Sequence, residues 1–262
     1  MATTQIEPAA GLQGVTGLPW TGVRYFSTWR VGGVSAAPRD SLNLGTHVGD
    51  DPQAVHQNRQ RLRCALPADP LWLEQVHGTT VFDAEAAGAV DTPGGRGPCA
   101  DAAVTRLRGQ PLVIMTADCL PVVLADVSGT VLGVAHAGWR GLCAGVLETT
   151  LDALRRRAPQ ALGWRAWIGP GIGPAAFQVG PDVRDAFIGP GGDPAWAVFF
   201  VAEPDGTHWR ADLAGLARAR LLGAGVQQVE CSGECTWTQA DRYFSHRRDP
   251  GSGRQATLAW LV

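Results

Sequence analysis

The chain has 262 residues, of which 45% are hydrophobic and 18% charged, and its formal net charge is −2. This length suits one large domain or two small ones, with enough chain to bury a substantial core. The near-neutral charge argues against a nucleic-acid binder, and the sequence has no run of about eighteen apolar residues that would cross a membrane. The N-terminus lacks the charged start and apolar core of a signal peptide, so we expect a cytoplasmic protein.

All the basic residues are arginine, and the sequence contains no lysine. This absence excludes a Schiff-base lysine, a pyridoxal-phosphate anchor and the lysine of a P-loop. Any anion that the protein binds must therefore be held by arginine or by backbone N–H groups.

The N-terminal part of the chain predicts a mixture of strands, one helix and loops. Alternating apolar residues at 23–35 predict a strand pair with a glycine turn. Residues 50–66 predict a helix, because an aspartate cap and a proline stand at its start. Residues 70–78 predict a short strand that runs into a loop, and the Gly- and Pro-rich residues 85–100 predict a surface loop.

The centre of the sequence holds apolar runs separated by turn residues. Runs of Val, Ile and Leu of this length are typical of strands buried on both faces. The predicted strands are residues 101–107, 111–117, 120–126 and 131–137. The later elements are a helix at 141–157, strands and turns at 165–180, a short helix at 181–187, a strand at 196–203, a helix at 208–225 and a closing strand at 255–262.

Together these elements predict a single α/β domain built on a mixed central sheet, with helices outside it. We expect this domain to occupy residues 19–262 and to follow a flexible N-terminus at residues 1–18.

Two reactive side chains stand at the outer ends of the two central apolar runs. Cys119 precedes one run and His136 ends the other, so a hairpin would bring them together at its open end. Such a pair can be a nucleophile activated by an imidazole or two ligands of a soft divalent metal. A buried thiol with an unrelated histidine is the third interpretation. The neighbouring Asp118 and the turn at 138–141 add polar groups at the same end, which favours a functional pair.

His77 is a third candidate, because it stands at a predicted strand end before small and polar residues. With Cys119 and His136 it would complete a His₂Cys set, which leaves one zinc position open as in catalytic zinc sites. His77 and Cys119 are 42 positions apart, so spacing alone does not establish the set.

Several polar residues are candidates for binding an anion or a substrate. Arg140 follows a strand end and opens a helix, where a guanidinium and free N–H groups can meet an anion. A plain strand-to-helix turn explains the same pattern. We also expect Asn43, Arg59 and Arg247 to point into a cleft.

The motifs, taken in order, resemble those of the YfiH family, which is also called the laccase-domain or polyphenol-oxidase family. The resemblance extends from about residue 20 to the C-terminus. The motifs that carry it are SLNLGTHVGDDP, the NR pair, EQVHG, ADAAVT, TADCLPVVLAD, AHAGWRG, IGPGIGPAAFQVG and FSHRRD.

The resemblance implies an α/β sandwich similar to the catalytic domain of cytotoxic necrotising factor toxins. It implies a zinc ion held by His77, Cys119 and His136, with copper less favoured. The implied activity is phosphorolysis of adenosine, inosine, guanosine or methylthioadenosine, together with deamination of adenosine. The partners are then small molecules, namely purine nucleosides and phosphate, with no nucleic acid or membrane, and we expect a monomer.

This interpretation as a phosphorylase and deaminase gives the other polar residues roles in the reaction. Arg59, Arg140 or Arg247, with N–H groups around Gly138, would position phosphate. For deamination, Asp118 would move the proton.

Other activities proposed for such proteins stay open. Copper-dependent oxidation of phenols is disfavoured, because a multicopper oxidase needs roughly ten histidines in paired HxH motifs, whereas this chain has six histidines and no HxH. Amidase editing of a peptidoglycan precursor would use Cys119 as nucleophile or the metal equally well. A non-enzymatic metal-binding protein is the last alternative, against which the open ligand position argues.

Overall fold

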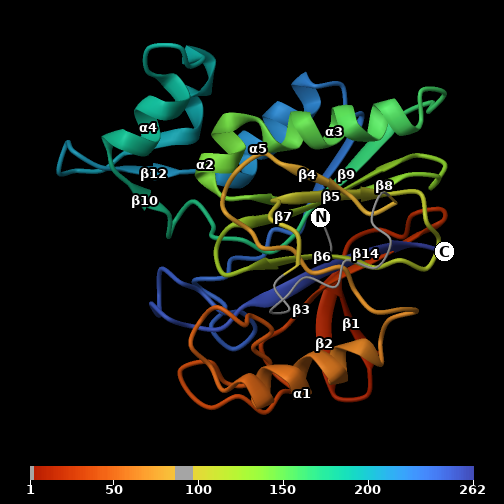
Figure 1. The fold of residues 1–262 in the computed structure, drawn as a ribbon. Helices are drawn as coiled ribbons and strands as arrows, with labels where there is room; N and C mark the ends of the chain where they lie inside the picture. The colour runs from red at the N-terminus through yellow and green to blue at the C-terminus, as the bar shows by residue number, and fades with distance from the viewer. Residues whose placement is uncertain (1–2, 86–96) are drawn as a thin grey trace.

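The computed structural model of the chain describes residues 3–85 and 97–262, and it contains two large sheets stacked face to face (Figure 1). One sheet has the strand order β1-β2-β3-β14-β6. Its strands are β1 (Thr4–Ala9), β2 (Leu12–Thr16), β3 (Val23–Thr28), β6 (Leu112–Thr116) and β14 (Gln255–Leu261). Every pairing in this sheet is antiparallel.

The second sheet has six strands in the order β13-β9-β7-β8-β5-β4. They are β4 (Val81–Asp83), β5 (Ala102–Thr105), β7 (Leu120–Asp126), β8 (Leu132–Ala137), β9 (Trp164–Ile168) and β13 (Gln228–Cys231). The pairs β4–β5 and β9–β13 are parallel and the others antiparallel, so this sheet is mixed. Apolar side chains from both sheets, among them Ile114 and Trp167, form the core between them.

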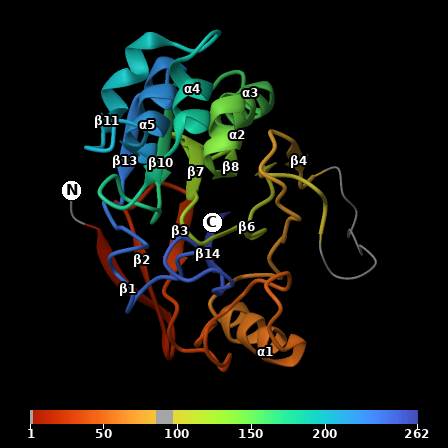
Figure 2. The ribbon, with the colours of Figure 1, turned by 90° about the vertical axis from the view of Figure 1, so that its left-hand side faces the viewer.

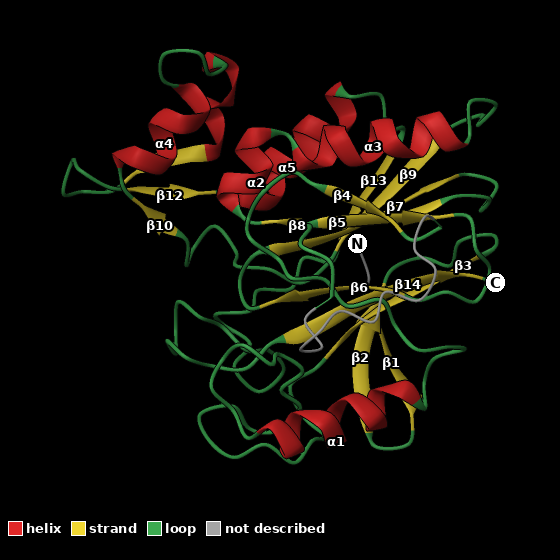
Figure 3. Ribbon diagram, viewed as in Figure 1, coloured by secondary structure: helices red, strands yellow, loops and turns green. Residues whose placement is uncertain are grey.

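Helices cover the outer faces of the two sheets, so the order of layers is helix, sheet, sheet, helix (Figures 2 and 3). On the six-stranded sheet lie α2 (Trp139–Ala144), α3 (Val146–Arg157) and α5 (Leu213–Gly223), which share one apolar cluster with that sheet. On the five-stranded sheet lies α1 (Pro52–Arg63), which begins at the predicted cap, with Asp51 accepting from the Gln53 N–H.

A smaller unit completes the fold beside α2. It contains the three-stranded sheet β10-β12-β11, the helix α4 and a 3₁₀ helix. Their bounds are β10 (Gln178–Val179), α4 (Pro181–Ile188), the 3₁₀ helix (Pro194–Phe199), β11 (Phe200–Ala202) and β12 (Trp209–Ala211). No helix of residues 3–85 and 97–262 is long and apolar enough to span a membrane.

The structure corrects the prediction of one central sheet. The runs at 112–116 and 120–126 follow each other closely but belong to different sheets, because β6 pairs with β14 whereas β7 pairs with β8 and β9. A strand buried on both faces looks the same in sequence whether it lies in one sheet or the other, so the apolar pattern could not separate them. The α/β sandwich is confirmed, and its likeness to the toxin domain stays a prediction.

The N-terminal segment expected to be flexible instead carries β1 and β2. These strands form a hairpin, and β2 pairs with β3, so the segment extends the five-stranded sheet. The physical reason is the apolar pattern of β2, which buries Leu12 and Val15 on the sheet.

Three further elements differ in detail from the sequence prediction. Residues 70–78 make only isolated bridges, at Leu71 and Glu74, instead of a strand. Only the first half of 23–35 is a strand. The expected helix at 141–157 is broken at Gly145, whose φ is 98°. Most of the predicted loop at 85–100 lies outside the described residues.

Candidate metal centre

The centre begins where the chain crosses from one large sheet to the other. After β6 ends, residues 117–119 lead to β7 in the second sheet, and β7 pairs antiparallel with β8. In this register Pro121 lies opposite His136. The predicted hairpin is therefore confirmed, and Cys119 and His136 lie at its open end.

The structure brings His77 to the same place. The Sγ atom of Cys119 lies 3.9 Å from Nε2 of His77, and the two imidazole rings have centroids 4.8 Å apart. One ligand atom from each of His77, Cys119 and His136 lies within 4.8 Å of the others. His136 is buried, Cys119 is half-buried and His77 is exposed, so the group opens to solvent on the His77 side.

Asp101 holds both histidines in position. Its Oδ1 lies 2.8 Å from Nδ1 of His136, which directs Nε2 of that ring toward Cys119 and His77. The same carboxylate accepts from the backbone N–H groups of Val76, His77 and Gly78. Asp101 is fully buried, as expected for the carboxylate that orients a metal-ligating histidine.

Two residues of the centre have backbone conformations that non-glycine residues rarely adopt. His77 has a φ of 61° and Asp118 a φ of 94°, and no other non-glycine residue in the described chain has a positive φ. Each such conformation costs on the order of 1–3 kcal/mol and persists where the surroundings enforce it. For His77 the enforcing contact is Asp101, and for Asp118 it is a set of hydrogen bonds described below.

Gly138 lies directly against the ligands. A Cβ atom at this position would stand 2.9 Å from the Cys119 sulfur and 2.9 Å from Cδ2 of His77. Both distances are shorter than real Cβ contacts, so only glycine fits between β8 and α2 here. The space around the centre thus explains Gly138 in the AHAGWRG motif.

Cys119 and His136 shift each other's pKa, and His77 adds to the shift of Cys119. Burial raises the pKa of Cys119, but the charge and hydrogen bonds of His136, and then those of His77, bring this pKa down to about 6. Burial lowers the pKa of His136, but the Cys119 thiolate and Asp101 raise it to about 9. Without a metal, the pair is therefore a thiolate beside an imidazolium at neutral pH. The thiolate is the form of cysteine that binds metals.

The donor set fits a tetrahedral divalent metal. Nitrogen and sulfur ligands of a tetrahedral zinc lie about 3.6 Å apart, given Zn–N near 2.05 Å and Zn–S near 2.3 Å, which is close to the separation of His77 and Cys119. Within residues 3–85 and 97–262 this is the one group of three or more His, Cys, Asp or Glu side chains close enough to hold an ion.

Asp118, predicted to act as an acid, lies beside the centre with both carboxylate oxygens bonded. Oδ1 accepts from the Thr236 hydroxyl at 2.7 Å, and Oδ2 accepts from the Arg247 N–H at 2.7 Å. Its carbonyl accepts from the Ile172 N–H. Asp118 therefore ties the cysteine turn to three separate segments.

The prediction that Asn43 points into a cleft is wrong. Asn43 is fully buried. Its amide nitrogen donates to the Gly45 carbonyl and to Asp50, and its amide oxygen accepts from the N–H groups of Gly45 and Arg254. These four bonds use its polar atoms inside the protein, so its role is to hold neighbouring backbone.

The three predicted arginines lie in different surroundings. Arg59 is half-buried, with its guanidinium carbon 3.7 Å from the centroid of the Trp72 ring, and burial lowers its pKa to about 10. Arg140 is exposed beside the Trp139 ring. Arg247 is exposed, and its guanidinium donates to the Gln178 carbonyl. Arg247 joins the centre through its bond to Asp118.

Sequence reasoning assigned no role to Asp101 or Arg254. The signal for Asp101 was an acid standing directly before an apolar strand, in the ADAAVT motif. Arg254 gave no comparable signal, because a single arginine before the last strand also suits a solvated surface.

Comparison with known proteins agrees with these residues. A family model described as multi-copper polyphenol oxidoreductase laccase matches residues 24–262. The chain belongs to this family. A protein of Escherichia coli named purine nucleoside phosphorylase YfiH is 44% identical over 243 residues, covering 92% of this chain and 95% of that protein. One of Xylella fastidiosa, named purine nucleoside phosphorylase, is 49% identical over 256 residues, covering 93% and 94%.

A solved structure has the same fold. The crystal structure of YlmD from Geobacillus stearothermophilus superimposes with a TM-score of 0.88 at 30% identity, covering 99% of each chain. The predicted membership of the YfiH family is confirmed by these names and by the family match.

Proposed function

We propose that this protein is a zinc-dependent purine nucleoside phosphorylase that also deaminates adenosine, and that it works in the cytoplasm as a monomer. The observation that carries the proposal is the convergence of His77, Cys119 and His136 on one point, with Asp101 behind the histidines. The phosphorylase names of relatives that match over most of the chain support the substrate class.

The three ligands would hold zinc, which supplies a Lewis acid with an open position when bound. The residues themselves fix the geometry. Asp101 keeps the His136 ring in one orientation, and Gly138 allows the backbone to approach the sulfur. His77, the exposed ligand, faces the side from which a substrate would enter.

In phosphorolysis an oxygen of phosphate forms a bond to C1′ of the pentose while the bond from C1′ to the purine nitrogen breaks. The electron pair leaves with the base, which takes up a proton, and the products are the free base and pentose 1-phosphate. The transition state resembles an oxocarbenium ion, so holding phosphate beside the sugar lowers the barrier. We assign this task to arginines around the centre, with Arg59, Arg140 and Arg247 as the candidates.

In deamination an oxygen from water would form a bond to purine C6, and the C6 amino group would leave as ammonia after taking up a proton. Asp118 is our candidate for moving the proton. It is adjacent to Cys119, and each of its carboxylate oxygens, although already hydrogen-bonded once, can accept a further hydrogen bond. Deamination needs no phosphate, so Arg140→Gln is expected to slow phosphorolysis more than deamination. Equal losses of the two activities in Arg140→Gln would refute the assignment of Arg140 to the phosphate site.

The experiment is to incubate zinc-loaded protein with adenosine and inosine, with and without phosphate, and to measure free base. We expect phosphate-dependent release of hypoxanthine from inosine that Cys119→Ala abolishes. Metal analysis of the same samples checks the ligand set, because full zinc retention by Cys119→Ala and His136→Ala would refute it.

The same preparation separates the alternative activities. Release of an amino acid from a muramyl–amino-acid precursor without nucleoside turnover would replace the phosphorylase by an amidase. Several copper atoms per chain together with phenol oxidation would restore the oxidase that the family description names.

A further inference from the structure

Arg254 is a half-buried cation that directly precedes β14, where the next residue, Gln255, pairs with Thr116 at the end of the strand that leads to Cys119. No carboxylate of the described residues lies within 4.0 Å of its guanidinium, in contrast to many other arginines of the chain. Its Nη1 donates to the carbonyls of Ser252 and Gly253. Nε and Nη2 have no partner among the described residues, yet they are not sealed from solvent.

The guanidinium of Arg254 is within electrostatic range of Cys119 and Asp118. Burial lowers its pKa, while Cys119 and Asp118 raise it, so both acidic groups lie close enough to act on the guanidinium. Asp118 forms no direct salt bridge with the guanidinium, and its oxygens accept from Thr236 and from the Arg247 N–H. A desolvated guanidinium without a counter-ion costs free energy, which a bound anion would recover.

The segment at residues 43–45 is built around this arginine. The Arg254 N–H donates to Asn43 Oδ1 at 2.9 Å, and its carbonyl accepts from the Leu44 N–H at 3.0 Å. A Cβ on Gly45 would stand 2.9 Å from Cγ of Arg254, so the glycine makes room for the arginine stem. The contact with the Arg254 backbone explains why Asn43 is buried and why its side-chain amide is fully hydrogen-bonded.

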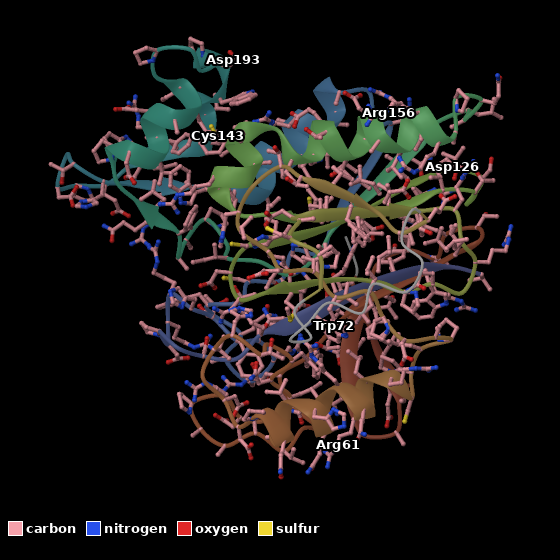
Figure 4. All side chains as sticks on the ribbon, in the orientation of Figure 1. Arg61, Trp72, Asp126, Cys143, Arg156 and Asp193 are labelled. Carbon is pink, nitrogen blue, oxygen red and sulfur yellow. The ribbon has the colours of Figure 1, made fainter. Side chains whose placement is uncertain are left out.

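Arg59 contacts the same segment from α1. Its Nε donates to the Leu44 carbonyl at 3.0 Å, and its Nη2 lies 3.9 Å from the sulfur of Met115, on the strand that leads to Cys119. It has no carboxylate partner in the described chain either. Figure 4 shows Trp72, on which Arg59 stacks, between α1 and the sheets.

We propose that Arg254, together with Arg59, forms the anion subsite of the metal centre and binds inorganic phosphate there. The inference rests on the phosphorylase function proposed above and names its phosphate ligands. It gives Asn43 and Gly45 the role of positioning residues.

The test measures phosphate binding directly and then kinetics. Zinc-loaded wild type, Arg254→Gln and Arg254→Lys are titrated with inorganic phosphate by calorimetry, and KM for phosphate is measured with inosine. We expect Arg254→Gln to weaken phosphate binding and raise KM by about tenfold to a hundredfold, as loss of a charge-assisted bond predicts. The lysine variant should recover part of the loss. Arg156→Gln, on the exposed face of α3 (Figure 4), is the control and should behave as wild type.

Gly45→Ala provides a second variant that leaves both guanidinium groups in place. It should raise KM for phosphate by displacing the Arg254 stem, with zinc content unchanged. Unaltered phosphate affinity in Arg254→Gln would overturn the subsite. Phosphate binding that depends on zinc but not on Arg254 would also overturn the subsite. Phosphate binding that requires Arg254 without any nucleoside turnover would keep the subsite and refute the phosphorylase.

Discussion

At the residue scale, the carboxylate of Asp101 acts on two histidines of the candidate metal centre at once. It bonds the His136 ring directly and fixes His77 through three backbone N–H groups. A residue outside the candidate ligand set therefore positions two of its three members. Gly138, also outside this set, contributes only the absence of a side chain.

Asp101→Asn should weaken zinc binding without removing a ligand. The amide keeps the size of the carboxylate but loses its charge and presents a donor to part of the N–H cluster, so about a 10- to 100-fold loss in zinc affinity is expected. Competition with a chromogenic chelator measures it. Asp152→Asn, on the exposed side of α3, is the control. An unchanged dissociation constant in Asp101→Asn would contradict the role of this carboxylate.

Gly138→Ala should damage the centre by crowding it. The added Cβ must displace Cys119 or His77, and a metal site tolerates displacements of only about 0.5 Å. We expect zinc affinity to fall by about tenfold or more. Gly223→Ala is a matched control, since a Cβ there meets nothing within 4 Å. Equal zinc affinity in the two variants would show that the site relaxes around the methyl group.

At the element scale, the hairpin of β7 and β8 could be predicted because its signals are local. The turn residues and the two apolar runs lie within one stretch, and they placed Cys119 next to His136. The position of His77 and the sheet assignment of β6 depend on contacts between distant segments, which no local pattern records. Asn43 was misjudged for a related reason, because an asparagine that caps buried backbone and one that binds a substrate have the same sequence signature.

Gly145 separates α2 from α3, and its replacement tests why the two are not one helix. Its φ of 98° is unfavourable for any residue with a Cβ. Gly145→Ala should lower the free energy of unfolding by about 1–2 kcal/mol, measured by urea denaturation. Gly223→Ala, in an ordinary helical position, should leave stability equal or slightly higher. No loss in Gly145→Ala would mean that the break carries no strain.

At the scale of the whole molecule, zinc should stabilise the fold by linkage. A ligand that binds only the native state adds about 4 kcal/mol when it is present at a thousand times its dissociation constant. Chelation should therefore lower the melting temperature of the wild type, and re-addition of zinc should restore it. Cys119→Ala should melt at the same temperature with or without zinc. A zinc-dependent shift in that variant would point to a second metal site.

The crossing of the chain at residues 117–119 has a consequence for the order of assembly. His77 and Cys119 are 42 residues apart, and they approach each other only when the loop at His77 docks beside the end of β6 and the start of β7. Closing a loop of this length in an unfolded chain has an entropic cost, which stacking of the two sheets meets beforehand, so we expect most zinc to enter a chain that has already stacked its two sheets. Uptake of zinc during refolding is then a late event, so its rate reports formation of the native state rather than nucleation of folding.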